Sequence, residues 1–126
     1  MNQVLFSHSS EHWATPKDLY KSLNDEFSFT LDPCPLNSLR DGLEINWSGH
    51  RVYCNPPYGR GISKWLEKSR EADLAVYLLP SRTDTKWWHD WAMKAVEIRF
   101  LRGRLKFNDS KNSAPFPSVL LIYRGW

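Results

Sequence analysis

The spacing of apolar residues along the chain predicts an alternation of helices and strands. Leu19, Leu23 and Phe27 recur at four-residue intervals, as on one face of a helix, and Thr15-Pro16 just before them suits a helix start. Residues 74–79 instead form an unbroken apolar run, which is typical of a buried strand. The pattern predicts helices at residues 16–24, 62–72 and 85–94, and strands at residues 29–31, 51–54, 74–79, 96–101 and 119–123.

The order of these elements predicts the fold class. Helices that alternate with strands indicate an α/β sheet with helices on its faces. No helix separates the last two strands, so we expect an antiparallel pair that residues 105–107 continue after a bend. Thr83 or Asp84 is expected to cap the third helix. The 126 residues contain no internal repeat and fit a single domain, residues 1–126, of which the polar residues 1–12 are expected to be loose.

Composition argues against several classes of protein. Hydrophobic residues make up 41% of the chain, enough for a packed core, yet no run approaches the ~18 apolar residues of a membrane span. The N-terminal residues lack the basic start and apolar stretch of a signal peptide. Two cysteines cannot build a disulfide framework, and the four histidines show no metal-binding spacing. We therefore expect a cytoplasmic protein with no membrane segment and no metal site.

Charge is unevenly distributed between the two halves of the chain. Residues 1–63 hold 5 Lys and Arg against 7 Asp and Glu, a net charge of −2, whereas residues 64–126 hold 12 against 7, a net charge of +5. Aromatic residues make up 14% of the chain and are interleaved with the basic half. This combination favours a nucleic-acid partner, and the alternative is a soluble domain with one basic face. The 7 tryptophans also leave a homo-oligomer interface open.

Residues 55–58, Asn-Pro-Pro-Tyr, form the sharpest local pattern and directly follow the strand predicted at residues 51–54. Ligands of open α/β sheets lie outside the carboxyl ends of the strands, and two prolines stiffen this loop. The side-chain oxygen of Asn55 and the carbonyl of Pro56 offer two acceptors for an exocyclic amino group, while Tyr58 offers a face for stacking a base. This set suits methyl transfer to the amino nitrogen of adenine. The alternative is a rigid turn without chemistry.

Six segments carry a wider resemblance, in order along the chain. They are residues 13–16, 29–32, 41–43, 55–59, 78–87 and 102–107. Together they resemble the phage-type, Dam-like family of DNA N6-adenine methyltransferases. The resemblance implies an abridged Rossmann-like methyltransferase sheet, S-adenosylmethionine as the cofactor and DNA as the partner. For a phage or prophage source, it also implies the bacterial cytoplasm.

The resemblance assigns roles by position. The residues that match the family's catalytic loop are Asn55, Pro56, Pro57 and Tyr58. Thr15 and Pro16 resemble the element that contacts the methionine end of the cofactor. Asp41 resembles the acidic residue that binds the amino group of the cofactor adenine. Asp32 matches either the residue near the methionine amine or the residue that binds the ribose hydroxyls.

The sequence departs from the larger methyltransferases of this superfamily. Residues 32–37 contain no glycine, where the larger enzymes carry a glycine-rich loop after the first strand. About twenty residues separate Asp32 from Asn55, too few for two βα units, so an abridged sheet is expected. Residues 1–126 hold no separate target-recognition domain, so we expect low sequence specificity or a second subunit. The alternatives to this enzyme are a non-catalytic nucleic-acid binder on the same scaffold, and a methyltransferase that acts on RNA or on a protein glutamine.

Several residues outside the loop have two interpretations. The basic residues predicted to contact nucleic acid are Arg60, Arg82, Arg102, Arg104 and Lys106. The alternative for residues 102–106 is a charged hairpin edge that discourages aggregation. Trp47 is expected either in the core or over the cofactor adenine.

Overall fold

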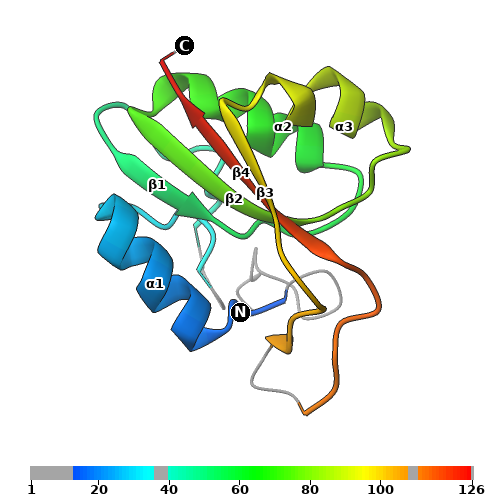
Figure 1. The fold of residues 1–126 in the computed structure, drawn as a ribbon. Coiled ribbons are helices and arrows are strands. Elements are labelled where there is room, and N and C mark those ends of the chain that lie inside the picture. The colour runs from blue at the N-terminus through cyan, green and yellow to red at the C-terminus, as the bar shows by residue number, and fades with distance from the viewer. Residues whose placement is uncertain (1–12, 36–39, 108–110, 126) are drawn as a thin grey trace, which may run out of the picture.

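A computed structural model describes residues 13–35, 40–107 and 111–125 of the chain, so the predicted loose segment 1–12 lies outside it. Within these residues, one sheet of four strands has the order β1-β2-β4-β3. The strands are β1 (Arg51–Cys54), β2 (Leu74–Pro80), β3 (Glu97–Phe100) and β4 (Ser118–Arg124). Helix α1 (Lys17–Phe27) lies on one side of the sheet, and helices α2 (Ile62–Glu67) and α3 (Lys86–Asp90) lie on the other (Figure 1). The prediction of an α/β fold is confirmed.

Strand directions bring three carboxyl ends to one edge of the sheet. β1 and β2 are parallel, whereas β4 runs antiparallel to both of its neighbours, β2 and β3. The antiparallel pairing predicted for the last two strands is therefore confirmed. It follows that β1, β2 and β3 all run in the same direction, so the loops that leave their carboxyl ends gather at the same edge (Figure 1).

The strand predicted at residues 29–31 is reduced to a single bridge beside β1. Leu31 pairs in parallel with Val52, and Tyr53 N–H donates to the carbonyl of Leu31 at 3.0 Å. Pro33 follows two residues later, and a proline has no N–H with which to continue a ladder. The pairing nevertheless fixes Asp32 next to the carboxyl half of β1.

The helix predicted at residues 16–24 is present as α1 and extends to Phe27, whereas the other two predicted helices are broken. The helix predicted at residues 62–72 divides into α2 and the 3-10 helix η1 (Lys68–Glu71). The one predicted at residues 85–94 divides at Trp91 (φ −127°) into α3 and the 3-10 helix η2 (Ala92–Lys94). Thr85 caps α3, because its Oγ1 accepts a hydrogen bond of 3.3 Å from Trp88 N–H. The prediction that Thr83 or Asp84 is the cap is wrong.

Residues 105–107 do not continue the pairing of β3, so that prediction is also wrong. The carbonyl of Leu105 instead accepts a hydrogen bond of 2.8 Å from Ala114 N–H, which ties the outgoing segment to the returning one. Phe107 is buried there. These two segments lie beyond the carboxyl end of β3, close to the loop that follows β1.

The core lies along the two central strands and holds the site in place. All residues of β2 are buried, as are residues 118–123 of β4. α1 contributes Leu23 and Phe27 to this core. Within the described part of the chain, no helix has the length and apolar character needed to cross a membrane.

Candidate active site

At the carboxyl edge of the sheet, Asn55 is anchored at both ends of its side-chain amide. It directly follows β1, and the two prolines after it end the ladder. Its side chain is only 3% exposed. The amide nitrogen donates to the carbonyl of Trp13 and to Thr15 Oγ1 at 3.2 Å, and the amide oxygen accepts from Tyr58 Oη at 2.8 Å. Each end of this amide therefore has a fixed direction.

Tyr58 braces Asn55 from within the same loop. Its hydroxyl also lies 3.3 Å from the carbonyl of Leu78, at the neighbouring strand β2. The ring is 8% exposed and packs edge-on against Phe107 and Phe116, with centroids 6.4 and 5.7 Å away. At this exposure the ring has no face open for a stacked base in the present conformation. Base stacking by Tyr58 therefore stays a prediction for another conformation.

A cavity of about 310 Å³ opens beside Asn55. Of the residues predicted for the cofactor and the catalytic loop, three line it, namely Thr15, Asp32 and Asn55. The other five do not, namely Pro16, Asp41, Pro56, Pro57 and Tyr58. The other lining residues are Ala14, Lys17, Tyr20, Cys34, Pro35 and Tyr53. Tyr53 was not among the predicted site residues, although a signal existed, because residues two apart on a strand face the same side and Tyr53 precedes Asn55 by two.

Asp32 supplies an acidic group to the cavity. Its Oδ1 accepts a hydrogen bond of 3.0 Å from Cys34 N–H. Solvent reaches the carboxylate through the cavity, yet the surrounding protein displaces enough water to raise the pKa of Asp32 to about 6. The same hydrogen bond favours the charged form but does not offset this desolvation. With Lys17 also on its wall, the cavity carries one group of each charge, which matches an amino-acid zwitterion.

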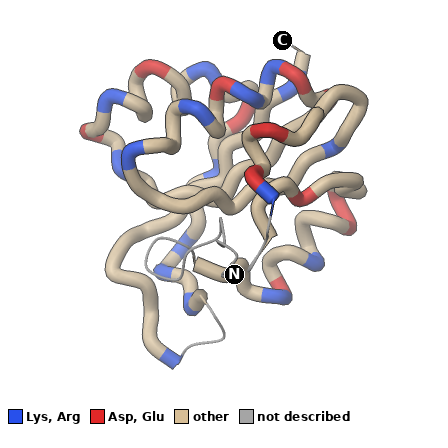
Figure 2. Tube along the Cα trace, turned by 180° about the vertical axis from the view of Figure 1, so that it is seen from behind, with Lys and Arg blue, Asp and Glu red and all other residues tan. Residues whose placement is uncertain are grey.

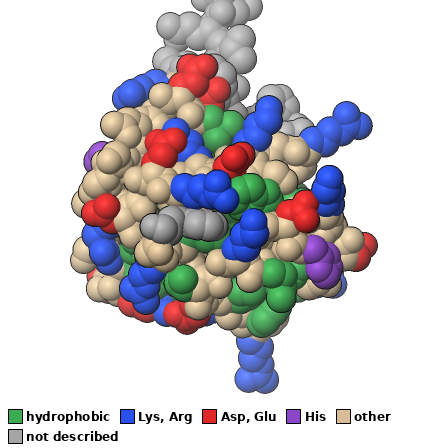
Figure 3. All heavy atoms as spheres, turned by 90° about the horizontal axis from the view of Figure 1, so that it is seen from above, with side chains coloured by type: hydrophobic (Ala, Val, Ile, Leu, Met, Phe, Trp, Pro, Cys, Tyr) green, Lys and Arg blue, Asp and Glu red, His purple; other side chains and the backbone are tan. Residues whose placement is uncertain are grey.

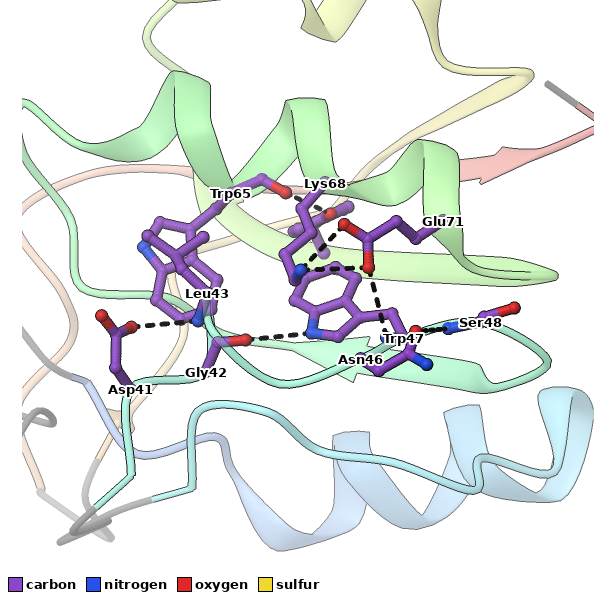
Figure 4. A network of polar contacts seen from close by, with 10 residues as sticks. Asp41, Gly42, Leu43, Asn46, Trp47, Ser48, Trp65, Lys68 and Glu71 are labelled. Atoms are coloured by element: carbon purple, nitrogen blue, oxygen red, sulfur yellow. Dashed lines mark hydrogen bonds and ion pairs between the residues drawn. The ribbon is translucent and has the colours of Figure 1, made fainter.

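Asp41 belongs to a structural loop rather than to the cavity wall (Figure 4). Its Oδ1 accepts from Leu43 N–H at 3.0 Å, and the next residue, Gly42, accepts at its carbonyl from Trp47 Nε1 at 3.0 Å. A Cβ on Gly42 would lie 2.0 Å from the carbonyl oxygen of Pro33. Only glycine fits this close approach, so the loop is packed against the segment that carries Asp32.

Trp47 is a core residue. It is completely buried, with Lys68 Nζ 5.6 Å from the centroid of its ring (Figure 4). Glu71 binds Lys68 Nζ at 2.8 Å and accepts from Trp47 N–H at 3.4 Å. The alternative in which Trp47 covers the cofactor adenine is therefore wrong for this structure. Asp41 keeps its predicted role toward that adenine only as an expectation.

The comparison with protein families decides to which family the chain belongs. The model of the family described as DNA N-6-adenine-methyltransferase (Dam) matches residues 4–126, nearly the whole chain. The chain belongs to the Dam family. A search of curated proteins and a search of solved structures each find no match. Membership supports a DNA methyltransferase, and the mixed α/β sheet is consistent with a methyltransferase fold.

The Dam family implies a DNA substrate, so the position of the basic residues matters. All five predicted contacts are exposed. Arg60 lies in the loop after β1, Arg82 directly after β2, and residues 102–106 after β3, so all follow strands that end at the edge holding Asn55. Arg82 also lies over the ring of Phe116, 5.7 Å from its centroid.

The charge pattern differs between this edge and the helical side. The described residues 101–107 and 111–117 contain 4 Lys and Arg and no Asp or Glu. In Figure 2 these segments form the loops below the sheet, and the charged residues coloured on them are Lys and Arg. The face in Figure 3, on the side of α2 and α3, instead mixes basic with acidic side chains. Among the described residues, no group of three or more His, Cys, Asp or Glu can hold a metal ion.

Proposed function

We propose that this protein transfers a methyl group from S-adenosylmethionine to the N6 amino group of adenine in DNA. One observation carries the proposal. Asn55, whose amide oxygen is held by Tyr58 Oη in the loop after β1, also lines the cavity that contains Asp32 and Thr15. The Asn55 side chain therefore both carries the proposed hydrogen-bond acceptor for a substrate amine and borders the candidate cofactor site.

The cavity residues fit the amino-acid end of the cofactor. The Asp32 carboxylate suits an α-ammonium group, and Lys17 suits an α-carboxylate on the same wall. S-adenosylmethionine, when bound, supplies a methyl group on a positively charged sulfur that leaves as a neutral thioether. The resemblance leaves two roles open for Asp32, at the methionine amine or at the ribose hydroxyls. Its position beside Thr15 and Lys17 favours the methionine amine.

Asn55 and Pro56 act on the adenine amino group by orienting it. The lone pair of this nitrogen is delocalised into the ring, which makes it a weak nucleophile. Two fixed acceptors, Asn55 Oδ1 and the Pro56 carbonyl, would hold both amino protons and favour a nitrogen whose lone pair faces the methyl group. Asn55 Oδ1 already accepts one hydrogen bond from Tyr58, and an amide oxygen accepts two.

The basic residues at the same edge would bind the phosphate backbone beside the extruded base. Lys and Arg contacts to phosphates supply most of the sequence-independent affinity for DNA. An enzyme that acts on a base must take it out of the stack, so its backbone contacts should flank the pocket. Arg82 and residues 102–106 satisfy this condition because they follow strands that end at the Asn55 edge.

The test is transfer of isotope-labelled methyl from S-adenosylmethionine to adenine-containing DNA, single-stranded and duplex. We expect label in N6-methyladenine, and Asn55→Ala should lower the rate by at least about a hundredfold, the usual effect of removing a preorganised polar group. Asn46→Ala is the matched control, because Asn46 is exposed and only caps the turn at Ser48.

The second candidate function is that of a non-catalytic DNA-binding protein, and the absence of glycine from residues 32–37 favours it. In that case the protein binds DNA with a salt-dependent affinity but transfers no methyl group to DNA. Parallel reactions with RNA and with a glutamine-containing peptide test the other two classes of methyl acceptor on which the Asn-Pro-Pro-Tyr loop could act. Label in either of these, and none in DNA, would overturn the proposed substrate.

A further inference from the structure

Tyr53 connects to Asn55 through Thr15. Tyr53 Oη and Thr15 Oγ1 share a hydrogen bond of 2.5 Å, and Thr15 Oγ1 accepts from Asn55 Nδ2 at 3.2 Å. All three residues line the same cavity. Tyr53 is 2% exposed, and burial raises its pKa, so the phenol stays neutral. The three side chains form a continuous hydrogen-bonded row from the middle of β1 to the loop after it.

The contacts of Asn55 with Trp13, Thr15 and Tyr58 determine which end of its amide faces which way. A backbone carbonyl can only accept, so the bond from Asn55 to the carbonyl of Trp13 requires the nitrogen at that end. The second proton of this nitrogen goes to Thr15 Oγ1, which therefore acts as an acceptor toward Asn55. The amide oxygen is left on the opposite side, where Tyr58 Oη meets it.

We propose that Tyr53 and Thr15 are positioning residues, which hold the Asn55 amide with its oxygen presented to the substrate amine. The inference rests on the proposed function only for its catalytic consequence. Without the Tyr53 hydroxyl, Thr15 Oγ1 loses a partner and is free to rotate away from Asn55. An amide that turns over would present N–H groups to an amino group, and two donors facing each other cannot form a hydrogen bond.

If the Tyr53 hydroxyl only stabilised the fold, removing another buried tyrosine hydroxyl would have the same effect. Tyr77, on the neighbouring strand β2, is completely buried and donates its hydroxyl to the carbonyl of Trp65 at 2.5 Å. It does not line the cavity. Tyr77→Phe therefore removes an equivalent buried hydroxyl without disturbing the row. It is the matched control for any general loss of stability.

Kinetics separate positioning from binding. We expect Tyr53→Phe to lower kcat about tenfold and Thr15→Val by more, since small misplacements of reacting groups are costly. The KM for DNA should stay within about twofold of wild type in both variants, and so should the Kd for S-adenosylhomocysteine in Tyr53→Phe. Thr15→Ser keeps the hydroxyl and should restore most of the rate, and Tyr77→Phe should leave kcat unchanged. A Tyr53→Phe variant that only weakens S-adenosylhomocysteine binding would make Tyr53 a cofactor contact and overturn the proposal.

A double variant tests whether Tyr53 acts through Asn55. In the Asn55→Ala background, Tyr53→Phe should cost nothing further, because residues that act as one unit are not additive. An undiminished tenfold loss in that background would overturn the proposal.

Side-chain NMR tests the same claim without any activity. The Asn55 Nδ2 protons are identified as the signals that disappear in Asn55→Ala. Their exchange with water should be several-fold faster in Tyr53→Phe and Thr15→Val, and unchanged in Tyr77→Phe and Thr15→Ser. Exchange at the wild-type rate in Tyr53→Phe would overturn the positioning role. If wild-type protein transfers no methyl group, the proposed function fails, while these exchange rates still decide whether Tyr53 and Thr15 hold Asn55.

Discussion

Tyr58 Oη donates a hydrogen bond of 2.8 Å to Asn55 Oδ1 across a loop of two prolines. The prolines restrict the backbone between these side chains, and the hydroxyl joins them. The same hydroxyl reaches the carbonyl of Leu78 at 3.3 Å and so connects the loop after β1 to β2. Within Asn-Pro-Pro-Tyr, the tyrosine thus braces the asparagine in this conformation.

Replacing Tyr58 by Phe should therefore affect both stability and activity. The ring would still pack against Phe107 and Phe116, but Asn55 Oδ1 would lose the hydroxyl that donates to it, and the contact of that hydroxyl with the Leu78 carbonyl would be lost. We expect a loss of about 1 kcal/mol in the free energy of unfolding, measured with urea. The rate of methyl transfer should fall by more than this stability loss explains.

Tyr77→Phe serves as the comparison for this variant. It should lose a similar free energy of unfolding, because it also removes one buried hydroxyl, but keep the wild-type rate. Equal rates for Tyr58→Phe and Tyr77→Phe would show that the hydrogen bond between Tyr58 and Asn55 has no part in the reaction.

The raised pKa of Asp32 predicts how ligand affinity depends on pH. With a pKa of about 6, the carboxyl group is ionised at pH 7.5 and largely protonated at pH 5. Only the ionised form pairs with an ammonium group. The affinity for S-adenosylhomocysteine, measured by calorimetry, should therefore fall as the pH drops below 6 in wild type. Asp32→Asn should bind weakly at every pH and lose this dependence.

The raised pKa of Asp32 affects the stability of the fold in the opposite direction: ligand affinity rises with pH, whereas stability falls. The ordinary pKa of an aspartate is about 3.9, so between about pH 4 and pH 6 the folded state binds more protons than the unfolded state. This group therefore makes the protein less stable as the pH rises through that interval. Relative to wild type, Asp32→Asn should become more stable on going from pH 4 to pH 7 in urea unfolding. A constant difference between the two proteins would contradict the raised pKa.

Gly42 offers a test of the loop that carries Asp41. A Cβ at this position would lie 2.0 Å from the Pro33 carbonyl oxygen and 2.9 Å from the ring of Trp65. Gly42→Ala should lower the free energy of unfolding by about 1–3 kcal/mol, the usual cost of overpacking. At Gly61 a Cβ meets nothing within 4 Å, so Gly61→Ala should be close to neutral. Similar melting temperatures for the two variants would rule out the close approach.

The basic edge predicts a specific salt dependence. Replacing Arg102 or Arg104 by Ala should weaken DNA binding and reduce the slope of log K against log salt by about 1, because one phosphate is then no longer neutralised. Arg124 is an exposed arginine at the carboxyl end of β4, which runs opposite to the other strands. Arg124→Ala should therefore leave the slope unchanged. A similar reduction in all three variants would indicate unspecific attraction by net charge.

Local patterns predicted the central elements well. Residues 51–54 and β2 were predicted within one residue, because an apolar run followed by proline leaves little choice of structure. Residues 29–31 form only one bridge, since Pro33 ends the pairing. Thr85 rather than Asp84 caps α3, because the start of a five-residue helix depends on where the packed Trp88 lies.

The site was predicted less completely than the fold. Asn55, Thr15 and Asp32 were predicted for the site, and the fold brings them together around one cavity. Asp41 does not line this cavity, although its loop packs against Pro33, next to Asp32, and its role toward the cofactor adenine stays a prediction. Tyr53 was missed because an aromatic residue in a strand is common, and only the three-dimensional structure shows its hydroxyl meeting Thr15 from another segment.

The most direct test of the central claim is mass spectrometry of nucleosides from DNA incubated with S-adenosylmethionine and the protein. Wild-type protein and Asn46→Ala should produce N6-methyladenine, whereas Asn55→Ala should produce at least about a hundredfold less. The absence of N6-methyladenine with wild-type protein on both single-stranded and duplex DNA would contradict the proposed reaction. Equal amounts with Asn55→Ala would contradict the role of Asn55.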